Sequence, residues 1–119
     1  MTDLVFTDDG PIIARDTDVN DFISQGWDAK ADRLVIPVSR LSPDFFKLST
    51  RLAGEVLQKC TNYNFRVAIV GDISAYLEKS GPLRDFVYES NRRGDVRFVG
   101  SLTELEGGSP GVPIPRPFG

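Results

Sequence analysis

The chain has 119 residues, of which 17 are acidic, 14 are basic and none is histidine, so its formal net charge is −3. Its length fits one domain with a single core, and its acidic balance disfavours nucleic acid and anionic membranes as partners. The lack of histidine excludes the usual serine and cysteine triads and any metal site that needs histidine. No apolar run is long enough to cross a membrane and no signal-peptide pattern is found, and the one cysteine, Cys60, is interpreted as a buried thiol in a reducing compartment. We therefore expect a cytoplasmic protein without a metal or other cofactor.

The first part of the chain predicts an antiparallel edge. Residues 3–7 and 11–15 are strand candidates on either side of Asp8-Asp9-Gly10, and Asp-Gly is a strong signal for a hairpin turn.

A short helix should follow, capped by Thr17 or Asp18, because four apolar residues share one face at helical spacing: Val19, Phe22, Ile23 and Trp27. Asp16, Asp18 and Asn20 also match the start of a calcium-binding loop. That match fails further on, where Asp21 replaces the required glycine and Trp27 the bidentate glutamate, so helix capping is the better interpretation.

The centre of the chain predicts a strand, a long helix and a second strand. Residues 33–38 are rich in β-branched side chains, although Pro37 cannot donate a ladder hydrogen bond. From Ser42 an apolar stripe recurs every three to four residues up to Cys60, and Pro43 suits a first helical turn. The next strand runs from Phe65 and ends at Gly71-Asp72. Arg66 near its start is its single charged residue and the residues after it are apolar, as expected of a parallel strand covered on both faces.

Ser49 and Thr50 are candidate phosphorylation positions, and their environment depends on where the long helix begins. A helix that begins at Ser42 leaves both mid-helix as ordinary polar residues, which is the interpretation that Ser42-Pro43 favours. A later start would place both hydroxyls at the helix amino end, where the helix dipole favours an added phosphate.

The last part of the domain continues the same alternation. Residues 74–79 predict a helical turn, Ser80-Gly81-Pro82 opens a helix that Gly94 can cap, and residues 96–99 form a last strand. Residues 101–106 form a short acidic turn or helix. From Gly107 onward the chain is rich in proline and glycine; this proline-rich segment (residues 107–119) is expected to be a flexible tail.

These elements predict a single α/β domain over residues 1–106. We expect a mixed sheet of about five strands, with an antiparallel hairpin at the start and parallel crossovers afterwards, packed with helices.

Few residues remain for chemistry, because the P-loop and dinucleotide glycine patterns are also missing. Asp72 stands at the carboxyl end of a predicted strand, where open α/β sheets usually bind ligands. If the following helix packs over that edge, Glu89 could approach Asp72 and the two carboxylates could divide acid and base roles, with Tyr88 and Asn91 as further ligand contacts. The alternative is structural: Asp72 caps the turn at Ser74, and Glu89 pairs with a neighbouring arginine.

Three separated motifs carry a family resemblance. They are residues 45–59 (FFKLSTRLAGEVLQK), 68–72 (AIVGD) and 84–91 (RDFVYESN). In these, and over the chain up to about residue 106, the sequence resembles the bacterial DUF4180 family of uncharacterised proteins. The resemblance brings no function, but the recurrent polar positions of that family coincide with Glu55, Asp72, Glu89 and Asn91.

The order of the elements also resembles the STAS fold of anti-sigma factor antagonists. In that fold the corresponding helix begins with an Asp-Ser-Ser-Gly motif whose serine is phosphorylated. Ser49 and Thr50 stand at about that place, but Leu48 replaces the aspartate of the motif and Arg51 its glycine.

Two functions follow as hypotheses. The first is a non-enzymatic regulatory or interaction domain that works through a protein partner at residues 42–60, or as a homodimer through its edge hairpin. The second is a small-molecule-binding protein, with or without catalysis, whose carboxylate-lined pocket at the carboxyl edge of the sheet contains Asp72, Tyr88, Glu89 and Asn91.

Overall fold

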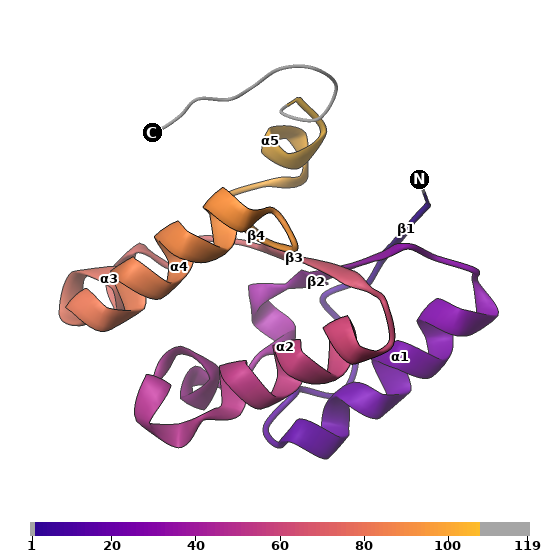
Figure 1. Ribbon diagram of the computed structural model, residues 1–119, viewed down its shortest axis with the longest axis horizontal. Coiled ribbons are helices and arrows are strands. Elements are labelled where there is room, and N and C mark those ends of the chain that lie inside the picture. Colours follow the sequence, from indigo (N-terminus) through magenta and orange to yellow (C-terminus); the bar gives the residue numbers. More distant parts are fainter. Residues whose placement is uncertain (1, 108–119) are drawn as a thin grey trace.

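The computed structural model describes residues 2–107, and these form four strands and five α-helices (Figure 1). The strands are β1 (Asp3–Val5), β2 (Arg33–Pro37), β3 (Arg66–Val70) and β4 (Val96–Val99). The helices are α1 (Val19–Asp28), α2 (Leu52–Asn62), α3 (Ser74–Lys79), α4 (Gly81–Arg93) and α5 (Leu102–Gly107). The predicted α/β class is confirmed, whereas the predicted flexible tail lies outside the described residues from residue 108 onward.

The four strands form one parallel sheet in the order β1-β2-β3-β4. Successive side chains of a strand point to opposite faces, so Leu34 and Val67 lie on one face while Val35 and Ala68 lie on the other. The first face packs in the main core with α1, α2 and α4, as expected when sequential parallel strands are joined by crossovers of one hand. The second face packs against Leu105 of α5, and Figure 1 shows α5 on the side of the sheet opposite to α1 and α2.

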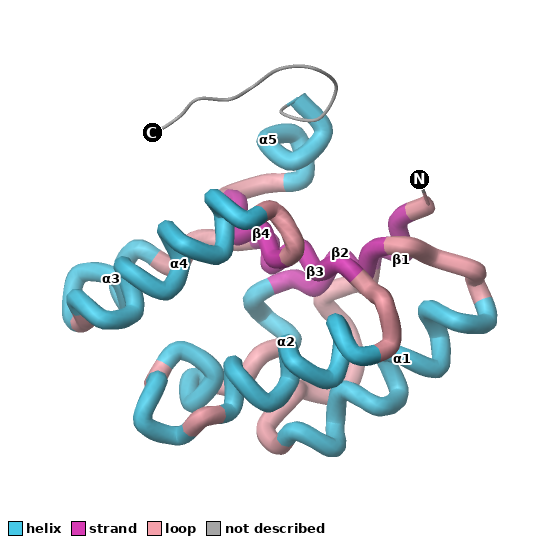
Figure 2. The backbone as a smooth tube through the Cα atoms, viewed as in Figure 1, coloured by secondary structure: helices cyan, strands magenta, loops and turns pink. Residues whose placement is uncertain are grey.

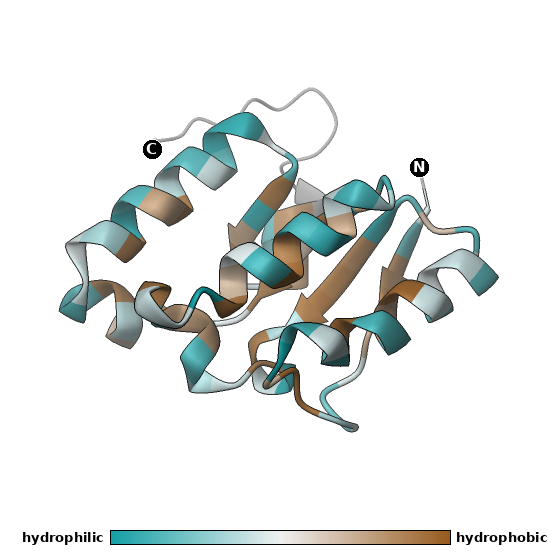
Figure 3. Cartoon of the chain, turned by 60° about the horizontal axis from the view of Figure 1, so that its bottom comes forward, coloured by the Kyte–Doolittle hydropathy of each residue, from teal (hydrophilic) through white to brown (hydrophobic). Residues whose placement is uncertain are grey.

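The strand β3 has the environment that its apolar sequence predicts. Val67, Ala68 and Ile69 are buried, and they belong alternately to the two cores. Figure 3 shows the strands as hydrophobic bands beneath helices whose outer faces are hydrophilic. Both faces of the central strand are therefore covered, which is why every position of this strand after Arg66 is apolar.

The predicted antiparallel hairpin and the fifth strand are wrong. β1 pairs with β2 in parallel, and beyond it Ile13 makes only an isolated parallel bridge with Leu41. The intervening loop is held instead by Arg40, which donates from Nη1 to the Thr7 carbonyl at 2.9 Å and from Nε to the Pro11 carbonyl at 2.8 Å. Two carbonyls that a hairpin ladder could use are thus bound by a side chain about thirty positions away, a partner that the local turn signal does not contain.

The predicted long helix from Ser42 is also wrong at its start. Residues 43–50 form two 3₁₀ turns, η3 (Pro43–Phe46) and η4 (Leu48–Thr50), and α2 begins only at Leu52. Arg51, between η4 and α2, has a left-handed backbone with φ of 65°. Figure 2 shows these turns as a separately coiled stretch before α2. Ser42 and Pro43 do start a helical segment, since Ser42 Oγ accepts from the Asp44 amide at 3.2 Å, but that segment is η3.

Helix α1 differs from its prediction in two details. Val19, Phe22 and Ile23 are buried as predicted, whereas Trp27 is 59% exposed. Asp18 precedes the first helical residue, but its carboxylate accepts from the amides of Ala14 and Arg15, both at 2.9 Å, rather than from the helix. These two bonds hold the pKa of Asp18 below its usual value.

Candidate functional site

Asp72 lies two residues beyond the end of β3, at the carboxyl edge of the sheet. Its Oδ1 accepts from the Ser74 hydroxyl at 2.7 Å and from the Ser74 amide at 2.9 Å, at the first residue of α3. These hydrogen bonds, that from the hydroxyl first, stabilise the charged form and lower the pKa of Asp72. The structural alternative for Asp72 is confirmed, since it fastens the turn into α3.

Glu89 and Tyr88 lie on the solvent-exposed side of α4. The Glu89 carboxylate accepts from Arg92 Nη2 at 3.3 Å, one helical turn away, and both side chains are largely exposed. The Tyr88 side chain is 63% exposed. Glu89 thus makes the contact that its structural alternative predicted, and such a surface pair adds little stability.

Unlike Tyr88 and Glu89, Asn91 makes a structural contact, because its side chain is hydrogen-bonded to the backbone of the edge strand. Its Oδ1 accepts from the Phe98 amide at 2.7 Å, and its Nδ2 donates to the Phe98 carbonyl at 3.4 Å. Phe98 lies in β4, whose outer side has no neighbouring strand in the described sheet. The amide of Asn91 therefore replaces a missing strand at this position, which protects the edge from pairing with another chain.

The four predicted ligand residues are not gathered at one place by these contacts. Asp72 belongs to the carboxyl edge, whereas α4 runs back over the sheet and brings Asn91 beside β4. In the described residues, the side-chain bonds of Asp72 and Glu89 go to Ser74 and Arg92, and none joins the two carboxylates. Their division of acid and base roles stays a prediction.

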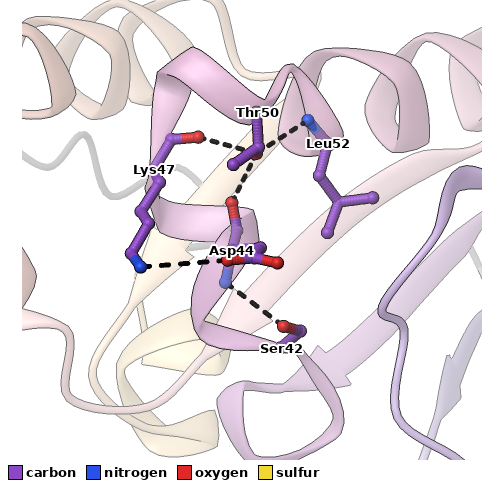
Figure 4. Close-up of polar contacts among 5 residues, drawn as sticks. All are labelled: Ser42, Asp44, Lys47, Thr50 and Leu52. Atoms are coloured by element: carbon purple, nitrogen blue, oxygen red, sulfur yellow. Dashed lines mark hydrogen bonds and ion pairs between the residues drawn. The ribbon is translucent and has the colours of Figure 1, made fainter.

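The turns before α2 bring polar groups together, with Thr50 at their centre (Figure 4). The Thr50 hydroxyl lies 2.7 Å from the Asp44 carbonyl and 2.8 Å from the Lys47 carbonyl, and it accepts from the Leu52 amide at 3.2 Å. Such a hydroxyl competes with regular helical hydrogen bonding, which explains why the helix does not continue back through this stretch. Thr50 thereby fixes the start of α2.

Ser49 is adjacent to Thr50 but has a different environment. Its side chain is exposed, it makes no side-chain hydrogen bond within the described residues, and it stands between the exposed cations Lys47 and Arg51. The nearest ion pair is the long contact of 3.9 Å between Lys47 Nζ and Asp44. The interpretation that left Ser49 and Thr50 mid-helix is wrong, because both directly precede α2.

Arg40 is a site residue that the sequence reasoning missed. Only 6% of it is exposed, and its guanidinium lies between Gly10 and the ring of Phe22, 4.8 Å from the ring centroid. Arg40 also lines a cavity of about 220 Å³. Two of the other lining residues, Asp18 and Asp21, carry carboxylates. The remaining ones are Pro11, Phe22, Ser24 and Gln25. No local pattern marks Arg40, because its partners come from a loop far away in the sequence.

Further observations concern metal binding, the Cys60 thiol and the length of the helices. Among the described residues, no three acidic, cysteine or histidine side chains are grouped so that they could hold a metal ion. Lys59 Nζ lies 3.7 Å from Asp16 and 3.3 Å from Asn20 Oδ1, so a cation of the protein itself contacts the residues that resembled a calcium loop.

Burial raises the pKa of the Cys60 thiol to about 12, which keeps it protonated. Over the same residues, the helices are too short or too polar to span a bilayer.

Fold and contacts together define a small parallel α/β protein. Three of its predicted site residues hold helix starts or the sheet edge: Asp72, Thr50 and Asn91. The chain belongs to the DUF4180 family, because the model of that family, described as a domain of unknown function, matches residues 2–107. The resemblance drawn from the three motifs is thereby confirmed. Comparison with curated proteins and with solved structures found no match.

Proposed function

We propose that this protein is a non-enzymatic, cytoplasmic regulatory domain with a STAS-like fold, and that it works through a protein partner at the stretch leading into α2. The observation that carries the proposal is the position of Ser49, which is exposed, adjacent to the amino end of α2 and flanked by Lys47 and Arg51. The parallel crossovers, with α1, α2 and α4 packed in one core, also suit the resemblance to anti-sigma factor antagonists.

The contacts favour Ser49 over Thr50 as the residue that is modified. A phosphate on Thr50 would remove the proton that its hydroxyl offers to the Asp44 and Lys47 carbonyls, and would thereby disrupt the start of α2. A phosphate on Ser49 would add about 1.5 to 2 negative charges beside Lys47 and Arg51, near the positive end of the helix dipole. Modification of Ser49 would therefore change the charge of the surface and leave the fold intact.

The test combines modification with partner binding. The intact mass of the protein purified from its own cells should include a population heavier by one phosphate, mapped to Ser49. In affinity capture, at least one protein should bind Ser49→Asp and Ser49→Ala chains differently. Thr103→Asp is the matched control, because it adds the same charge at an exposed hydroxyl residue on α5. An unmodified Ser49 together with identical binding by both Ser49 variants would refute the proposal.

A second candidate function is supported by the cavity beside Arg40. This site combines a buried guanidinium with the carboxylates of Asp18 and Asp21 and lies where the chain leaves β1 and β2, at the carboxyl edge of the sheet. Its volume of about 220 Å³ is below the roughly 300 to 1,000 Å³ of most ligand pockets, so only a small polar molecule would fit. Native mass spectrometry should then detect extra mass that is lost on denaturation and reduced in Asp21→Asn. A native mass equal to that of the bare chain would remove this candidate.

A further inference from the structure

Two aromatic side chains stand together on the surface, away from the start of α2. Trp27, on the last turn of α1, is 59% exposed, and Tyr63, directly after α2, is 47% exposed. Their ring centroids are 5.2 Å apart and their planes meet at 78°, in an edge-to-face arrangement. With about half of each side chain exposed, this aromatic pair (Trp27 and Tyr63) leaves roughly 200 Å² of ring surface in water.

The fold itself places the pair at the surface. Helices α1 and α2 pack against each other and both run back from the carboxyl edge of the sheet, so their ends are neighbours. At Gly26 the backbone of α1 comes so near the core that an added Cβ would lie 2.7 Å from Leu34 Cδ2 and 2.9 Å from Phe65 Cζ. Because Gly26 faces inward, the next residue, Trp27, is turned away from the core. The aromatic pair thus follows from close backbone packing rather than from an unfilled core.

Exposed tryptophan and tyrosine are the side chains that most often dominate the energy of protein interfaces. Pairs of aromatic rings are also the usual receptor for proline-rich peptides, whose polyproline II conformation is adopted before binding and therefore costs little entropy.

The chain contains a ligand of this chemistry in its own proline-rich segment. Residues 110–117 read Pro-Gly-Val-Pro-Ile-Pro-Arg-Pro, with prolines at both ends of a P-x-x-P run and then at every second position. Arg116 within it carries a positive charge, which the partial negative charges at the carboxyl ends of α1 and α2 would attract.

The position of α5 indicates whether the aromatic pair binds the proline-rich segment of its own chain or that of a second copy. The segment continues from α5, which packs on the sheet face opposite to α1 and α2 (Figure 1). Only residues 108–112 separate α5 from Pro113, and the reach of five residues is at most about 18 Å. To reach the aromatic pair of its own chain, the segment would have to pass the sheet and a helix layer that is itself about 10 to 12 Å thick.

We propose that the aromatic pair of one copy binds the proline-rich segment of a second copy, so that the protein associates with itself through Trp27 and Tyr63. This inference stands apart from the regulatory role of Ser49, which uses the other end of α2.

Trp27 provides the test, because it is the single tryptophan of the chain. Its emission and the molar mass from light scattering are measured on the full chain over a dilution series. Four proteins are compared: the natural chain, Tyr63→Ser, the combined Pro113→Ala, Pro115→Ala and Pro117→Ala variant, and Tyr88→Ser. Tyr88→Ser is the matched control, because it removes another exposed tyrosine elsewhere on the surface. Circular dichroism verifies that each variant is folded.

In the natural chain and in Tyr88→Ser, emission should shift to shorter wavelength and molar mass should rise together as concentration increases. Both changes should vanish in the proline variant and weaken at least tenfold in Tyr63→Ser. A peptide of residues 109–119, added to the proline variant, should restore the emission shift without raising the mass to that of a dimer. A monomer at every concentration would overturn the proposal, as would association that persists in the proline variant. An emission change in the proline variant at the lowest concentration, without a change in mass, would also overturn it by showing that each chain binds its own segment.

Discussion

Replacing Thr50 by valine tests whether one hydroxyl determines the start of α2. Valine keeps the β-branched shape and removes only the oxygen, so the Leu52 amide loses its acceptor and the Asp44 and Lys47 carbonyls lose their donor. Loss of the hydrogen bond from the Leu52 amide costs about 1 kcal/mol, and loss of a donor that two carbonyls share costs about another 0.5 to 1 kcal/mol. We therefore expect the free energy of unfolding to fall by about 1.5 to 2 kcal/mol.

The measurement is urea unfolding followed by circular dichroism, with Thr50→Ser as the matched variant that retains the hydroxyl. Thr50→Ser should lie within about 0.5 kcal/mol of the natural chain, while Thr50→Val should lower the midpoint at an unchanged dependence on urea. In a thermal scan the valine variant should melt roughly 4 to 10 °C lower. If Thr50→Val were as stable as the natural chain, or if Thr50→Ser lost as much, the hydroxyl would not be what holds these turns.

Four further substitutions probe the site and the core. Asp72→Asn should lower stability above pH 3.8, and the difference from the natural chain should disappear as pH falls through the lowered pKa of the carboxyl; equal pH profiles of unfolding would contradict this. Gly26→Ala should destabilise the fold by about 1 to 3 kcal/mol, because its Cβ would meet Leu34. Gly54→Ala, on the open side of α2, should stabilise it by about 0.5 to 1 kcal/mol, and the same sign of change at both glycines in urea unfolding would be inconsistent with this packing. Asn91→Ala should cost about 1 to 2 kcal/mol and raise aggregation in light scattering, because it leaves the edge of β4 unprotected; an equally stable, monodisperse variant would argue against that role.

Local chemistry was enough to predict several elements from the sequence. The apolar run that ends at Val70 predicted a strand covered on both faces, and β3 is buried in that way. Ser80 caps α4 through the Leu83 amide, and Gly94 ends it with a positive φ of 88°. The structural alternatives for Asp72 and Glu89 were also correct, because each bonds a residue within three positions along the chain.

The sequence by itself therefore determined the α/β class, most helix and strand positions and the turn at Asp72, since apolar periodicity and short-range hydrogen bonds are properties of neighbouring residues. The tertiary structure alone decided the rest. Arg40 bonds carbonyls about thirty positions away and so prevents the hairpin that Asp-Gly suggested. Close packing at Gly26 turns Trp27 outward although its spacing predicts a core position. Both outcomes depend on partners that meet only when the chain is folded, which is why no pattern along the sequence contains them.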